Sequence, residues 1–146
     1  MSIEDDVALL ERVPTLRLLG DSSLRMLAIG SEQRDFEHGD TLFNVGDDAD
    51  AGYIVQRGAF RVEDGSAEIV VGPGSLIGEL ALIVAMKRPS NAIALERSSV
   101  IRVPRGLFQR VLESDPAAAR RLRDEMAART SQLASDMLIA GAKLST

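Results

Sequence analysis

Hydrophobic positions follow a helical spacing at both ends of this chain and a strand-like spacing in the middle. Near the start, apolar residues recur at helical intervals until Pro14 interrupts them, which predicts an amphipathic helix. These residues are Val7, Leu10 and Val13. A second short helix is predicted to have its cap at Asp21 and to end at Gly30.

From Gln33 onward the hydrophobic period becomes that of β-strands. Short apolar patches alternate with turn segments rich in glycine and aspartate. The patches are TLFNV, YIVQ, AFRV, AEIVV, AIALE and SVIRV. Asp64-Gly65, between AFRV and AEIVV, is a hairpin signal. Short strands at regular spacing with such turns predict an all-β barrel or jelly roll.

The helical period returns near the C-terminus. Pro104 suits a first helical turn, and the segment after it carries an apolar face. That face consists of Leu107, Phe108, Val111 and Leu112. Asp115-Pro116 predicts the start of a longer helix running towards Met137. Its stripe at spacings of three and four is Ala119, Leu122, Met126, Arg129 and Leu133.

Composition narrows the classes of function. With 146 residues the chain is expected to form one domain. The net charge of −5 and the low aromatic content of 3% argue against a nucleic-acid binder. No cysteine is present, which excludes disulfides and thiolate metal sites. We expect a cytoplasmic protein, because the first residues are acidic rather than basic and no apolar run approaches the ~20 residues of a membrane span.

The stretch from Gly72 to Leu95, GPGSLIGELALIVAMKRPSNAIAL, combines three glycines with one acid and one basic pair. A phosphate-binding P-loop requires a lysine directly after its last glycine, and none follows Gly78. The dinucleotide fingerprint GxGxxG fails because the glycines are one residue too widely spaced. His38 is the single histidine, so no metal site and no catalytic triad is predicted.

The same stretch can bind an anion in another way. Gly78 opens a turn that Leu80 to Ile83 can continue as helix, and the first N–H groups of such a turn can point at a phosphate. Arg88 adds a permanent charge with a fork of donors suited to phosphate oxygens. Phosphate repels Glu79, so a sugar hydroxyl is its natural partner. An anion, a hydroxyl and an apolar enclosure together describe a ribose phosphate.

The run GELALI, followed by Arg88 ten residues after Gly78, resembles the phosphate-binding cassette of cyclic nucleotide-binding domains. LLERVPTLRLLGDSSLRMLA is similar to the N-terminal helices of that family, and FEHGDTLFNVGDDADAGYIVQRGAFRVE to its early strands. The turns expected there are at Gly39, Gly46, Gly52 and Gly58. The resemblance implies a single domain, 1–146, whose fold is mainly β with flanking α. Its double-stranded β-helix (a jelly roll or β-roll, 31–103) would carry the cassette at 78–92, between N-terminal helices (1–30) and B and C helices (104–140).

The resemblance also implies a role for each cassette residue. Gly78 and Ala81 would offer backbone N–H groups, Glu79 would accept the ribose 2′-hydroxyl, and Arg88 would bind the cyclic phosphate. The remaining cassette residues implied at the ligand are Leu80, Pro89, Ser90 and Asn91. On the C helix, Arg129 interrupts an apolar stripe and is interpreted as a base contact. Proline has no N–H and no hydroxyl, so Pro89 removes one phosphate donor and favours cAMP over cGMP.

The predicted function is a regulatory module and not an enzyme, with cyclic nucleotide as ligand, no metal and no cofactor. Nucleotide would draw the C helix onto the β-roll, and an unknown effector protein would receive the signal. Glu79 could instead pair with Lys87, and the Arg129 stem could lie along apolar surface with its head in water. The C-helix stripe could equally be a homodimer seam.

Two other functions fit the sequence. One is a degenerate β-roll that binds no nucleotide and acts as an interaction domain, which the missing donor at Pro89 favours. The other is the sensor part of a Crp-type transcription regulator. Only GAKLST follows the stripe, so no helix-turn-helix and no DNA binding by this chain are expected.

Overall fold

The N-terminal part of the molecule is a small helical layer. The computed structural model describes residues 2–64 and 67–129. Helix α1 (Ile3–Glu11) begins at a capping box in which Ser2 and Asp5 exchange hydrogen bonds. It is followed by α2 (Pro14–Arg17) and α3 (Asp21–Gly30). The prediction of a cap at Asp21 is wrong: Gly20, with φ of 86°, is the N-cap, and Asp21 is the first helical residue and bonds Arg25.

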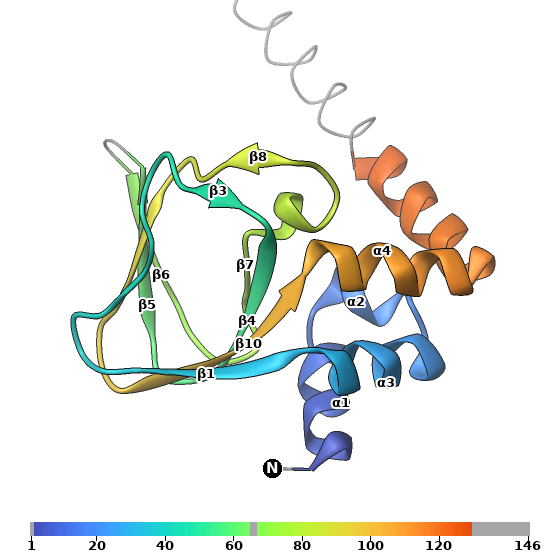
Figure 1. The fold of residues 1–146 in the computed structure, drawn as a ribbon, viewed down its shortest axis with the longest axis horizontal. Helices are drawn as coiled ribbons and strands as arrows, with labels where there is room; N and C mark the ends of the chain where they lie inside the picture. Colours follow the sequence, from blue (N-terminus) through green and yellow to red (C-terminus); the bar gives the residue numbers. More distant parts are fainter. Residues whose placement is uncertain (1, 65–66, 130–146) are drawn as a thin grey trace, which may run out of the picture.

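The central part is a β-roll of antiparallel strands (Figure 1). One sheet has the order β1-β10-β4-β7 and the other β2-β9-β5-β6, while β3 and β8 form a separate pair. In chain order the strands are β1 (Glu32–Phe36), β2 (Thr41–Phe43), β3 (Asp48–Ala49), β4 (Ala51–Arg57), β5 (Phe60–Asp64), β6 (Ala67–Val71), β7 (Leu76–Ile77), β8 (Met86–Lys87), β9 (Asn91–Ala94) and β10 (Ser98–Pro104). The predicted jelly-roll class is therefore confirmed.

The apolar patches mark six of these strands, and the hairpin signal is also correct. Strands β5 and β6 pair with Asp64 opposite Ala67, while residues 65–66 lie outside the described part. Strand β1, EQRDF, escapes prediction because its side chains are polar and mostly exposed, so no apolar alternation marks it. Gly52 does not form a turn but lies inside β4, where an added Cβ would come within 3.1–3.2 Å of Leu82 and Leu76.

Two hydrophobic cores lie on opposite faces of the sheet that contains β4. Alternation along this strand directs Tyr53 and Val55 into the roll and Ile54 towards the helices. Phe60 and Val100 are fully buried inside the roll. The second core joins the N-terminal helices to the C-terminal ones (Figure 1).

The C-terminal helices pack on this second core. Pro104 is the N-cap of α4 (Arg105–Ser114), and the predicted apolar face buries Phe108 and Val111. A second helix occupies residues 116–129, where the described part of the chain ends. Its buried face is Ala118 and Leu122, so the stripe begins one residue earlier than predicted and packs within the molecule. Leu133 lies beyond the described residues, and so does the rest of the predicted seam.

Candidate functional site

The cassette turn begins at Gly78, where the chain leaves β7. Gly78 has φ of 80° and ψ of 39°, a left-handed conformation that suits glycine, and it caps the 3₁₀ turn η1 (Glu79–Leu82). The Ala81 N–H donates to the Gly78 carbonyl at 3.1 Å, so it is used inside the turn. Within the described part of the chain, the N–H groups of Gly78, Glu79 and Leu80 have no hydrogen-bond partner. Of the two N–H groups implied at the phosphate, that of Gly78 is free within the described residues and that of Ala81 is not.

Arg88 is buried beside this turn, with only 4% of its surface exposed. Its Nη2 donates to the Ala51 carbonyl at 2.9 Å, while its buried Nε has no partner among the described residues. The guanidinium carbon lies 4.3 Å from the ring centre of Phe43 and 5.4 Å from that of Tyr53. Both rings face a cation in the arrangement of cation–π contacts.

No carboxylate among the described residues forms an ion pair with Arg88. Burial lowers the pKa of the Arg88 guanidinium, with Tyr53 and Asp50 acting in the opposite direction. Asp50 is itself paired with Arg102, its Oδ2 lying 3.0 Å from Nη2. A buried cation without a paired anion is costly, and the side chain sits where a bound anion would relieve that cost.

A cavity of about 310 Å³ opens next to Arg88 and the cassette turn. Its polar groups are few: the Glu79 carboxylate, the Arg88 guanidinium and the Ser90 hydroxyl. Most of its wall is apolar, formed by Phe43, Ala49, Val62, Ile69, Val71, Leu76, Ile77, Leu80, Ala81, Met86 and Pro89. A concave, mainly apolar space with a few convergent polar groups is typical of small-molecule sites.

Glu79 is bonded from two distant parts of the chain. Its Oε2 accepts a hydrogen bond from the Thr15 hydroxyl at 3.2 Å, and its Oε1 lies 3.1 Å from Nη1 of Arg129. Nη2 of Arg129 also donates to the Thr15 hydroxyl at 3.0 Å. The lysine considered as a partner of Glu79, Lys87, is paired with Asp48 instead.

The structure brings most of the predicted ligand residues to one cavity. Residues 78–81 and 88–90 line it, with Leu80 and Pro89 exposed at its rim. Asn91 does not line it, because its Oδ1 accepts the Val45 N–H at 2.8 Å and fixes a neighbouring loop. Arg129 contacts Glu79, which lines the cavity, but does not line it itself, so its role as a base contact stays a prediction.

Sequence reasoning missed the residues that surround the functional side chains. Phe43 and Tyr53 flank Arg88, the Ala51 carbonyl orients it, and Thr15 bonds Glu79. Each contact joins positions far apart in the chain. A hint existed in the aromatic content of only 3%, which makes any aromatic residue inside the roll a candidate for a special role.

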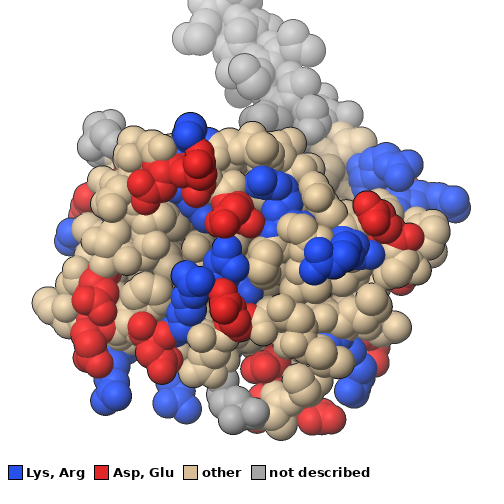
Figure 2. Space-filling view, viewed as in Figure 1, with Lys and Arg blue, Asp and Glu red and all other residues tan. Residues whose placement is uncertain are grey.

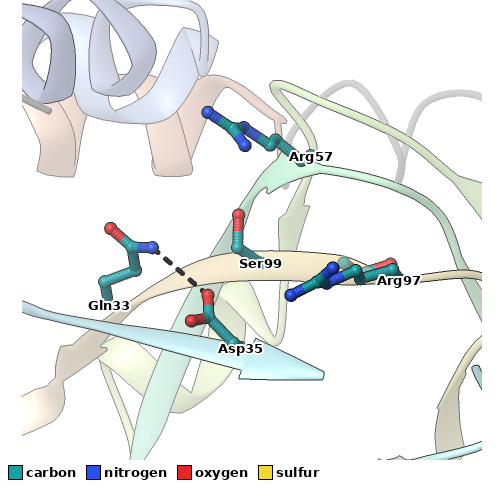
Figure 3. A pocket seen from close by; sticks show the side chains of 6 residues that line it. Gln33, Asp35, Arg57, Arg97 and Ser99 are labelled. Carbon is teal, nitrogen blue, oxygen red and sulfur yellow. Dashed lines mark hydrogen bonds between the residues drawn. The ribbon is translucent and has the colours of Figure 1, made fainter. Parts of the chain in front are cut away.

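A second and larger cavity, of about 500 Å³, lies on the outer face of β1, β10 and β4. Its lining is polar: Gln33, Asp35, Arg57, Arg97, Ser98 and Ser99. Ser99 lies between the side chains of Asp35 and Arg57, and Gln33 donates to Asp35 (Figure 3). Arg97 is 87% exposed, so this hollow is open to water and lacks the apolar wall of the cassette cavity.

Acidic and basic side chains are intermingled over most of the face drawn in Figure 2. Within the part of the chain that the structure describes, no helix is both long and apolar enough to cross a membrane. The same residues contain no cluster of three potential metal ligands of the histidine, cysteine and carboxylate types.

The curated relatives are longer proteins, and this chain matches only one part of each. The chain is 32% identical over 133 residues to an uncharacterized NTE family protein of Mycobacterium tuberculosis, covering 84% of this chain and 23% of that protein. It is 33% identical over 108 residues to a cAMP-dependent protein kinase regulatory subunit of Eremothecium gossypii, covering 72% and 23%. The chain thus spans less than a quarter of the length of these relatives.

Solved structures show the same fold. The N-terminal domain of a transcriptional regulator from Streptomyces coelicolor has a TM-score of 0.81 and 30% identity, covering 88% of this chain and 94% of that one. A cyclic nucleotide-binding-like protein from Brucella abortus has a TM-score of 0.66 and 35% identity, covering 75% and 98%. The family model of the cyclic nucleotide-binding domain matches residues 33–115, more than half of the chain. The chain therefore belongs to the cyclic nucleotide-binding domain family.

Proposed function

We propose that this chain is a regulatory module that binds a cyclic nucleotide in the cassette cavity, with cAMP favoured over cGMP. One observation carries the proposal: Arg88 is 4% exposed, and its guanidinium has no paired anion among the described residues. Within the described residues, its one hydrogen bond leaves most of its five N–H donors unused. A cyclic phosphate supplies the missing charge and accepts those donors.

The rest of the cavity suits the other parts of the ligand. The Glu79 oxygens each accept one hydrogen bond, and a carboxylate has about four acceptor positions, so a ribose hydroxyl can still donate to it. The N–H groups of Gly78, Glu79 and Leu80 have no partner among the described residues and would be available to the phosphate. Apolar side chains such as Val62 and Ile69 line the cavity and offer the base an apolar surface.

The preference for cAMP is argued from Pro89. This residue follows Arg88 directly and lines the cavity, and it has neither an N–H nor a hydroxyl to offer. A guanine base brings additional polar groups that need partners, whereas among the described residues the Ser90 hydroxyl is the one uncharged polar side chain that lines the cavity. Leaving polar groups of the ligand unpaired costs binding free energy, which disfavours cGMP.

Signalling would pass through the helix at residues 116–129. Arg129 on this helix contacts Glu79. A nucleotide that changes the position of Glu79 would therefore also change how the helix packs on the β-roll. A ligand shifts such an equilibrium only by its differential affinity for the two positions. The chain then acts through an effector protein and performs no chemistry itself.

The experiment is calorimetry of the whole chain with cAMP and cGMP, comparing the unaltered protein with Arg88→Met. Loss of charged hydrogen bonds to phosphate should cost about 1.5–3 kcal/mol of binding free energy. The free energy of unfolding without nucleotide should change by no more than about 1 kcal/mol, because an apolar side chain of similar volume removes an unpaired buried charge. Retention of full affinity in this variant would reject the assignment.

Arg57→Met is the matched control, since Arg57 is an exposed arginine at the other cavity. It should bind cAMP as the unaltered chain does. Nucleotide at ~100 times its dissociation constant should also raise the free energy of unfolding by about 2.7 kcal/mol. If neither nucleotide does so, the chain is a β-roll that binds no nucleotide and serves as an interaction domain.

A further inference from the structure

Arg105, the first residue of α4, makes an unusual set of contacts. Its Nη1 donates to the carbonyls of Ala49 at 2.8 Å, Val84 at 3.1 Å and Ala81 at 3.2 Å. The backbone N–H of Arg105 adds a fourth bond, to the Asp50 carbonyl at 2.8 Å. Among the described residues, Arg105 has no ion pair with a carboxylate.

The position of this arginine is otherwise unfavourable. The N-terminus of a helix carries a partial positive charge, so a cation in the first turn is repelled. Acidic residues are absent from the first turn of α4. The carbonyl oxygens of Ala49, Ala81 and Val84 therefore provide the compensating negative ends of dipoles at this site.

The contacted backbone belongs to the two halves of the nucleotide site. Ala81 lies in η1, and Val84 follows it in the same loop. Three consecutive carbonyls, from Ala49 to Ala51, accept hydrogen bonds from two arginines. The Arg105 side chain donates to the first and its backbone N–H to the second, while the Arg88 side chain donates to the third. The Arg105 guanidinium thus connects η1, whose first N–H groups are free within the described residues, with the segment from Ala49 to Ala51, which orients Arg88.

We propose that Arg105 is a positioning residue that fixes the distance between the η1 amides and the Arg88 guanidinium, and so sets the affinity for the anionic ligand. This inference builds on the proposed function, but the same contacts also predict how firmly Arg105 holds the η1 loop when no nucleotide is bound. Because α4 carries Arg105, any displacement of α4 moves both halves of the site together. Arg105 does not line the cassette cavity, so it would act on the ligand through the residues that it positions.

The test compares Arg105→Met, Arg105→Lys and Arg110→Met with the unaltered chain. Arg110 is an exposed arginine of the same helix with no hydrogen bond or ion pair in the described part, so it controls for loss of charge. Hydrogen exchange without nucleotide reports on the N–H groups of Ile83 and Val84, which donate to Leu80. In Arg105→Met these amides should exchange at least about tenfold faster, while the Arg110→Met protein should match the unaltered one.

Calorimetry with cAMP then measures affinity in the same proteins. Arg105→Met should weaken binding roughly tenfold or more, the loss expected for one hydrogen bond to a charged group. Arg105→Lys keeps the charge and three donors and should recover most of that loss. Should Arg105→Met not fold, the remaining loss of affinity in Arg105→Lys, measured against Arg110→Met, carries the comparison. Equal affinity and equal exchange in the Arg105 variants and Arg110→Met would overturn the inference. An unaltered chain that binds no nucleotide would instead reject the proposed function, and the exchange measurement would still decide the role of Arg105.

Discussion

The position of the Arg88 guanidinium depends on the absence of a side chain at Gly78. A Cβ placed on Gly78 would lie 2.6 Å from Nη1 of Arg88 and 3.5 Å from the Ala51 carbonyl oxygen. The backbone of Gly78 also has φ of 80°, where a side chain is strained. Glycine is therefore required both for the turn and for the space that the guanidinium occupies.

Gly78→Ala should destabilise the fold by about 1–2 kcal/mol through its positive φ and should also displace Arg88. Gly46→Ala is the matched control, because Gly46 has φ of 90° and no atom within 4 Å of its added Cβ. Urea denaturation should show a similar φ cost in both variants. Calorimetry with cAMP should show a loss of affinity in Gly78→Ala alone, and equal affinities would mean that Arg88 does not depend on that space.

At the scale of elements, the helix at 116–129 starts where a local signal places it. The Asp115 Oδ1 accepts the Ala118 N–H at 3.1 Å, and its Oδ2 accepts the Ser23 hydroxyl at 3.0 Å. The Ala118 N–H, and after it the Ser23 hydroxyl, lower the pKa of Asp115. The cap thus also ties this helix to α3, which contains Ser23.

This cap predicts a pH dependence of stability. A carboxylate with a lowered pKa contributes stability above its unfolded pKa of about 3.9, and the contribution is lost as the pH falls through the folded value. Asp115→Ala should therefore lower the melting temperature at neutral pH, and the difference from the unaltered chain should shrink below about pH 4. Thermal melts over a pH series measure it. Asp124→Ala removes an exposed carboxylate of the same helix, and a similar pH-dependent difference there would contradict the assignment to the cap.

At the scale of the molecule, Glu79 is the point where three parts of the chain meet. Thr15 comes from the N-terminal helices, Glu79 from the β-roll and Arg129 from the C-terminal helix. The ion pair is partly exposed, with 45% of the Arg129 side chain and 33% of the Glu79 side chain accessible, so solvent screens it. Its contribution to the free energy of unfolding is therefore modest.

A double-mutant cycle with Glu79→Gln and Arg129→Met should give a coupling energy of about 0.5–1 kcal/mol by urea denaturation. The coupling should fall in ~1 M salt, where charges are screened over about 3 Å. Glu125 lies 4.0 Å from Nε of Arg129, and a Glu125→Gln cycle should give a weaker coupling. A coupling of zero for the Glu79 pair would show that the helix does not contact the cassette in solution.

The sequence by itself determined the features that depend on local energetics. The change of hydrophobic period places α1, α3, α4 and six strands, but not α2, which begins at the proline expected to interrupt the helical pattern. Asp115-Pro116 starts the last helix, and the left-handed turn at Gly78 needs only a glycine. The family pattern of Gly78, Glu79 and Arg88 could also be recognised from the sequence. Residues on one short loop stay close together whatever surrounds them, and these three line the same cavity.

The tertiary structure decided what surrounds those side chains. The polar strand β1 exists because β10 supplies its hydrogen bonds, and the burial of Arg88 between Phe43 and Tyr53 follows from closing the roll. The bonds from Thr15 and Arg129 to Glu79, and from Arg105 to Ala49, join segments separated by dozens of residues. No local pattern specifies such contacts, since their free energy is gained only when the whole chain has packed.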